Sequence, residues 1–132
     1  MKVRQVFDRA MALINERDSG GAYHSDVTDF EKNAPELVNT AVTLLWLDEC
    51  VIRNTPVNEI SWEFTPIVDM EDEIPLHDAL ASGVLPFALA AFLLLEEDHA
   101  RAEYFYRLYS DARSRVVSSF ASAHHGSVKN VY

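Results

Sequence analysis

The sequence predicts a mainly α-helical domain, a small bundle of four to five helices with an extended arm or short β-hairpin between the second and third. Apolar residues recur at helical spacing in residues 3–16 and 28–52. Residues 84–95 are apolar nearly all round, which is typical of a buried central helix. Residues 60–64 instead alternate apolar and polar side chains, the pattern of a half-buried strand. With 132 residues, the chain can form one domain with its own core.

The first two expected helices carry start and stop signals. The sequence DSGG at residues 18–21 should end the first helix, because glycines follow a periodic run there. Thr28 and Glu31 match a capping box, in which each side chain binds a backbone N–H at the helix start. Pro35 should kink the second helix if it lies beyond the first turn. The apolar stripe of this helix contains Leu37, Val38, Ala41, Leu44, Leu45 and Asp48.

The segment 57–70 is expected to be the arm. Pro66 interrupts the alternating stretch, and residues 67–70 are a candidate return strand. Two strands alone are only marginally stable in water, so the arm needs support from the helices or from another subunit. Trp62 and Phe64 either fold back and complete the core or anchor an interface, and an open strand edge can pair with another chain.

Three more helices are expected in the second half of the chain. A short one covers residues 76–81, and the next begins near Leu85-Pro86. The last runs from Asp98-His99 to about Phe120 and has three acid-before-base pairs four residues apart: Glu97–Arg101, Glu103–Arg107 and Asp111–Arg115. The polar residues 122–132 are expected to form a flexible C-terminal tail, which leaves residues 1–121 as the domain.

The net charge of −10 is unevenly placed. Residues 54–100 contain ten acidic residues and no Lys or Arg. In the rest of the chain, the charges of the acidic and basic residues cancel. The negative electrostatic field of this segment disfavours ordinary DNA binding, which depends on Lys and Arg side chains that neutralise the phosphates. For any single acid, a solvated surface that aids solubility is the simpler explanation.

Other classes of protein are disfavoured by what the sequence contains. Cys50 is the single cysteine, so no internal disulfide can form, and its apolar surroundings suggest buried packing. The N-terminal residues lack the continuous apolar stretch of a secretory signal. The longest apolar run, residues 84–95, is shorter than the ~20 residues a spanning helix needs, so no membrane segment is expected. The four glycines form no phosphate-binding loop.

Glu96 and His99 stand three residues apart, the spacing of the Glu-x-x-His box in metal-carboxylate bundles. Such a bundle needs a second box and two further carboxylates. No other histidine has a carboxylate three positions earlier, although Asp48 or Glu49 could supply one acid. Asp98 as a helix cap and Glu97 as the partner of Arg101 give a simpler explanation. The sequence therefore predicts no metal, no cofactor and no catalytic residue.

Five segments in order resemble a known family. They are VRQVFDRA, NAPELVNT, DMEDEIPL, GVLPFALAAFLLLEED and AEYFYRLY. The order and composition of these segments, over roughly residues 3–111, resemble those of the head–tail connector, or neck adaptor, proteins of tailed bacteriophages and prophages. The resemblance carries over no catalytic residue.

The resemblance implies a structural virion protein. About twelve copies would form a ring beneath the portal, extend the DNA channel and offer a surface to the next neck or tail protein. Packaged double-stranded DNA would pass without sequence-specific binding, and the chain would reside in the host cytoplasm before assembly. Subunit or portal contacts are expected at Trp62, Phe64, Val131 and Tyr132. The acids that would line the channel or the surface are Glu59, Glu63, Asp69, Glu71, Asp72 and Glu73.

Two alternatives remain open from the sequence. One is a metal-carboxylate helical-bundle enzyme built on Glu96, His99 and an acid from the second helix. The other is a small acidic module that binds a basic protein. Bound metal would mark the first, and a tight complex with a basic partner but no ring would mark the second.

Overall fold

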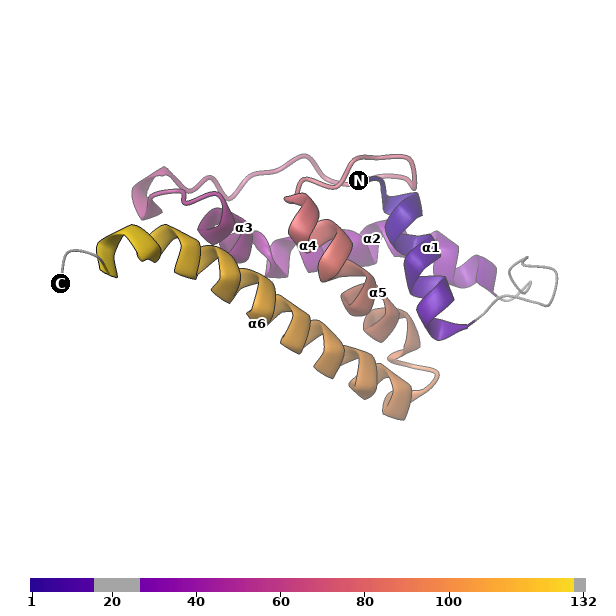
Figure 1. The fold of residues 1–132 in the computed structure, drawn as a ribbon. Coiled ribbons are helices and arrows are strands. Elements are labelled where there is room, and N and C mark those ends of the chain that lie inside the picture. Colours follow the sequence, from indigo (N-terminus) through magenta and orange to yellow (C-terminus); the bar gives the residue numbers. More distant parts are fainter. Residues whose placement is uncertain (16–26, 130–132) are drawn as a thin grey trace.

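The computed structural model describes residues 1–15 and 27–129, with side chains up to residue 124, and it confirms a mainly helical fold. Figure 1 shows the helices gathered around one core, with an extended segment crossing one side. Six α-helices lie within the described residues: α1 (Val3–Ile14), α2 (Thr28–Leu44), α3 (Trp46–Ile52), α4 (Asp78–Gly83), α5 (Leu85–Leu94) and α6 (His99–Lys129).

Helix α5 is the centre of the bundle, as its all-round apolar sequence predicts. It packs against α1, α2, α4 and α6. Leu85, Leu89 and Ala90 are fully buried, and Pro86 lies in the first turn, where its missing N–H leaves no helical bond unmade. Each buried leucine contributes roughly 2 kcal/mol through removal of its side chain from water.

Helix α1 buries most of its expected apolar stripe, including Val3, Phe7 and Ile14, whereas Leu13, expected in the same stripe, is exposed. It ends at Asn15, whose φ of 64° lies in the left-handed region that asparagine tolerates better than most residues. The Asn15 N–H donates to the Met11 carbonyl oxygen at 2.8 Å. The predicted stop signal at residues 18–21 lies outside the described residues.

The single second helix expected over residues 28–52 is divided into α2 and α3. At Leu45 the backbone tightens, and its N–H bonds to the carbonyl oxygens of both Ala41 and Val42. The predicted capping box is wrong: Val27 is the residue before the helix, and Thr28 is already helical. The Glu31 carboxylate instead accepts a hydrogen bond from Arg4 of α1 at 2.8 Å.

The predicted β-hairpin is also wrong, because the part of the chain that the structure describes contains no strand. Its one β-bridge joins Lys2 to Glu73. Residues 57–59 form a 3₁₀ turn, and residues 60–68 have no regular secondary structure. The arm is therefore present as an extended segment, and Pro66 removes one donor that a ladder would need.

Helices α4 and α6 differ from the expected boundaries. Helix α4 begins two residues late, at Asp78, where the His77 imidazole accepts a hydrogen bond from the Ala79 N–H. Helix α6 begins as predicted: the Asp98 carboxylate accepts from the Arg101 N–H at 3.2 Å. It ends at Lys129, not near Phe120.

The longer α6 has a tertiary cause. His124 Nε2 lies 3.0 Å from the Ile52 carbonyl oxygen, so the helix continues while it packs along α3. The expected boundary between residues 1–121 and 122–132 therefore falls inside α6. The Glu103–Arg107 and Asp111–Arg115 pairs form, whereas Arg101 donates to the Ile14 carbonyl oxygen instead of pairing with Glu97.

Candidate functional site

The arm is attached to the helices through its backbone. The Asn39 side-chain amide donates to the Ile67 carbonyl oxygen at 2.7 Å, and its oxygen accepts from the Ile67 N–H at 2.8 Å. One α2 side chain thus satisfies both backbone groups of an extended residue, as a neighbouring strand would. Ile67 and Met70 of the arm are themselves buried. The arm is supported by its own subunit, one of the two possibilities that its sequence leaves open.

The two aromatic residues of the arm have different environments. Phe64 is half-buried and stacks on Trp46 of α3 with ring centroids 5.0 Å apart. The Trp46 Nε1–H also donates to the Ser61 carbonyl oxygen at 2.5 Å. Trp62, in contrast, is 65% exposed. Of the two predicted interface aromatics, Trp62 is free to contact a partner, whereas Phe64 mainly holds the arm against α3.

The acids of residues 69–73 form a compact turn that binds the N-terminus of the chain. The Glu73 carboxylate lies 2.9 Å from the Met1 amino group. Glu71 lies 3.5 Å from Lys2 Nζ and 3.6 Å from Arg4 Nε. These are partly exposed pairs, each of which contributes about 0–1 kcal/mol. Their charge is partly compensated within the same subunit.

Asp72 and Asp69 organise the turn itself. The Asp72 carboxylate accepts from the Val68 and Asp69 N–H groups at 2.7 and 3.1 Å, and these two hydrogen bonds lower its pKa below the usual aspartate range. The Asp69 carboxylate accepts from the Glu71 N–H at 2.8 Å. Four of the six acidic candidates are therefore structural residues in this subunit. Glu59 and Glu63 are exposed and have no ion-pair partner among the described residues.

Val131 and Tyr132, the remaining predicted contact residues, lie outside the described residues. They remain predictions.

Glu96 and His99 do not form the metal box that their spacing allows. Glu96 is in the turn between α5 and α6, whereas His99 is the first residue of α6. Their side chains line different pockets. Asp48 and Glu49, either of which could have supplied one further carboxylate, are bound by Arg113 and Arg53. No group of three or more potential metal-binding side chains gathers within residues 1–15 and 27–124.

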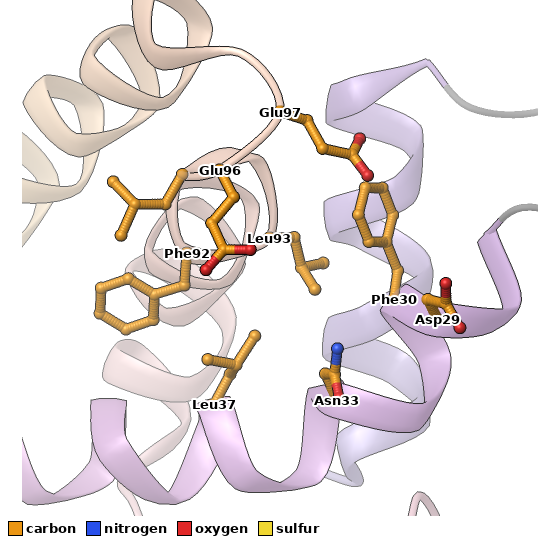
Figure 2. A pocket seen from close by; sticks show the side chains of 9 residues that line it. Asp29, Phe30, Asn33, Leu37, Phe92, Leu93, Glu96 and Glu97 are labelled. Atoms are coloured by element: carbon orange, nitrogen blue, oxygen red, sulfur yellow. The ribbon is translucent and has the colours of Figure 1, made fainter.

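Glu96 instead lines a polar pocket of about 350 Å³ between α2 and the α5–α6 turn. Figure 2 shows Glu96 from the turn and Asn33 from α2 pointing into the same space. Phe30, Leu37, Phe92 and Leu93 supply its apolar walls, and Asp29 and Glu97 stand at its edge. None of its three carboxylates has an ion-pair partner in the described part of the chain. A cationic group with an apolar stem matches this lining.

Two neighbouring buried acids stabilise α3. Asp48 accepts two hydrogen bonds from the Arg113 guanidinium, at 2.6 and 3.1 Å, and this pairing raises the pKa of Arg113. Glu49 binds Arg53 and also accepts from the His77 N–H at 2.7 Å, at the start of α4. These two carboxylates tie α3 to α6 and α4, so their function is structural.

Two exposed apolar surfaces were not predicted from the sequence. The first, here called the α3 patch, consists of Leu44, Leu47, Val51 and Val57, all of which are exposed. Leu44 was expected in the buried stripe, and the core side of α2 instead uses Ala34, Val38, Ala41 and Val42. The second, here called the α6 groove, is a mainly apolar hollow of about 400 Å³ lined by Ala91, Phe92, Leu95, Ala102 and Tyr106, with His99 and Glu103 at its edge.

Comparisons with known proteins leave the family open. No family model, no curated protein and no solved structure matches the chain. Within the described residues, every helix is too short or too polar to cross a membrane.

Proposed function

We propose that this chain is a structural subunit of a phage neck, which forms a ring between the portal and the tail-side proteins and extends the DNA channel. The observation that carries the proposal is the order of sequence segments that resembles head–tail connectors. A small helical body with an extended arm is the architecture that this resemblance implies. The role requires no catalytic residue and no cofactor, and it places the chain in the virion after assembly in the host cytoplasm.

The surface of the arm supports an assembly role. Trp62 is exposed beside Glu36, Asn39 and Pro66 in a shallow depression between the arm and α2. Exposed aromatic side chains of this kind commonly anchor protein interfaces. A contact there would bury a large side chain that the isolated subunit leaves in water. The portal, or the next neck protein, is the partner expected at this position.

The acidic segment suits a channel that does not grip DNA. Glu59 and Glu63 are exposed and have no ion-pair partner within the described part of the chain, and such carboxylates would repel phosphates and allow a duplex to slide past. On the outer rim the same acids would serve only solubility. Their position in the assembled neck therefore tests the channel part of the proposal.

The test is reconstitution with the portal protein encoded in the same phage or prophage genome. Electron cryomicroscopy should show a ring of this chain coaxial with the portal, with Trp62 in a contact. Absence of any portal complex would contradict the neck function. A ring with Glu59 and Glu63 on its outer surface would keep the neck function and remove the acidic-channel part.

A second candidate is an acidic module that binds a basic protein. The polar pocket between α2 and the α5–α6 turn favours it, because Asp29, Glu96 and Glu97 surround apolar walls and have no cationic partner among the described residues. This candidate would be supported by a one-to-one complex with a basic partner whose affinity falls in Glu96→Gln, together with the absence of a ring at any concentration.

A further inference from the structure

We propose that copies of this chain associate head to tail, with the α3 patch of one copy packed against the α6 groove of the next. The inference rests on the proposed function only for the closure of a ring. The contact itself rests on the two apolar surfaces and their positions. It assigns a role to both surfaces and identifies the partner of each as a second copy of this chain.

The α3 patch is too exposed for a surface that always faces water. Leu44 and Leu47 are 56% and 54% exposed, and Val57 is 87% exposed. Leu47 and Val51 are four residues apart on α3 and share one face. With Val57 they border a mainly apolar depression of about 400 Å³. Contiguous exposed apolar side chains of this kind mark protein contacts.

The α6 groove offers a matching surface of similar size. It lies between α5 and the first turns of α6 and has a volume of about 400 Å³. Leu95 and Tyr106 stand at its rim and are 54% and 55% exposed. Aliphatic side chains on a helix pack well into a groove with an apolar floor and an aromatic rim. Both surfaces are mainly apolar, so a contact between them would remove the exposed aliphatic side chains of one and the aromatic rim of the other from water.

The two surfaces lie at opposite ends of α6 and cannot meet within one copy. Arg113, at the middle of α6, and His124, near its C-terminal end, fix α3 against this helix. The groove uses Ala102 and Tyr106 near the start of this helix. Figure 1 shows α3 beside the late part of α6 and the α5–α6 turn at the other end. At 1.5 Å per residue, residues 102 and 124 are about 33 Å apart along the helix axis.

Charge at the two ends favours a second copy as the occupant. Arg53, at the end of α3 beside the patch, leaves 57% of its side chain exposed while it binds Glu49. Glu96 and Glu97 directly follow Leu95, which lines both the groove and the neighbouring polar pocket, and they have no ion-pair partner in the described residues. Seating the patch in the groove brings a guanidinium towards unpaired carboxylates. A contact between different surfaces repeats from copy to copy, and it produces a ring when the rotation closes.

Leu47→Glu and Leu95→Glu test the contact, because the two leucines are equally exposed and neither is needed for the core. Val68→Glu is the matched control: Val68 is 79% exposed, lies on the arm and belongs to neither surface. Thermal unfolding verifies that each variant folds, and sedimentation velocity gives the assembly state. The wild type and the control should self-associate, and each leucine variant should weaken association by at least about thirtyfold, as loss of an interface hot spot does.

Mixing the two leucine variants is the decisive step. Leu47→Glu retains an intact groove, and Leu95→Glu retains an intact patch, so the mixture should form a one-to-one heterodimer that grows no further. A mixture that stays monomeric, a wild type that stays monomeric, or variants that assemble like the wild type would each overturn the inference. The two proposals fail separately. Head-to-tail assembly without portal binding contradicts the neck function, whereas a ring that forms only on the portal contradicts the contact proposed here.

Discussion

Asn39 on α2 holds both backbone groups of Ile67, with its amide nitrogen 2.7 Å from the carbonyl oxygen and its amide oxygen 2.8 Å from the backbone nitrogen. This pair replaces a strand-to-strand ladder with one side chain. It explains how residues 60–68 stay extended on the helical body although no strand accompanies them in the described chain. The arm can then present Trp62 outward while Ile67 is buried.

Asn39→Ala should release the arm. Two hydrogen bonds to a partly buried backbone are lost, and the free energy of unfolding should fall by about 1–2 kcal/mol. Urea denaturation measures the loss, and hydrogen exchange should show faster exchange of the Ile67 amide. Asn33→Ala is the control, because Asn33 is exposed on the same helix, and it should change stability by less than about 0.5 kcal/mol. Equal effects of the two substitutions would contradict the assigned role.

Arg113→Met should destabilise the protein more than Arg115→Met. The first leaves the buried Asp48 carboxylate without its partner, which should cost about 2–3 kcal/mol because Arg113 itself is partly exposed. The second breaks a surface pair with Asp111 and should cost less than about 0.5 kcal/mol. Adding Asp48→Asn to Arg113→Met should recover part of the loss in a double-mutant cycle. Additive effects would show that the two side chains do not interact.

Asp72 should make the stability of the acidic turn depend on pH. Hydrogen bonds from Val68 and Asp69 lower the pKa of this carboxyl below its unfolded value. Its stabilisation is therefore complete above the usual aspartate pKa of about 4 and is lost as pH falls through the lowered pKa. Asp72→Asn should be less stable than the wild type at pH 7, and the difference should vanish in strong acid. Glu63→Gln, an exposed control, should show no such convergence.

Substitutions of Trp62 and Phe64 should have different effects, the first on assembly and the second on folding stability. Phe64→Ala removes the ring that stacks on Trp46 and should cost about 2 kcal/mol of folding stability. Trp62→Ala should change folding stability by less than about 0.5 kcal/mol, since this side chain is mostly in water. The same substitution should weaken portal or subunit binding, which a titration by sedimentation velocity measures. Parallel losses of folding and assembly in Trp62→Ala would contradict its role as an anchor.

The helices could be predicted where local sequence determines them. The stripe of α1, the all-round apolar α5 and the Asp98 cap of α6 depend on residues close together in the chain. The hairpin prediction failed because alternation at residues 60–64 indicates an extended backbone but not its partner. That partner is Asn39, 28 residues from Ile67. The end of α6 was missed for a similar reason, since His124 is positioned by Ile52 across 72 residues.

The candidate site was predictable in composition but not in arrangement. The acids of residues 69–73 could be identified from the sequence, yet their partners Met1, Lys2 and Arg4 lie at the other end of the chain. Leu44 was assigned to the core because residues 37–48 are apolar on more than one side of the helix. The extra apolar side is the α3 patch. A helix with apolar residues on two faces was the available signal for a contact surface.

Native mass spectrometry of the untagged, unchelated protein, alone and mixed with its portal, tests the central claim most directly because it reports oligomer mass and bound metal together. A metal-free ring of about a dozen copies, formed alone or on the portal, is the expected result. A monomer or dimer that carries stoichiometric metal and does not bind the portal would contradict the connector function. It would instead support the alternative of a metal site at Glu96 and His99.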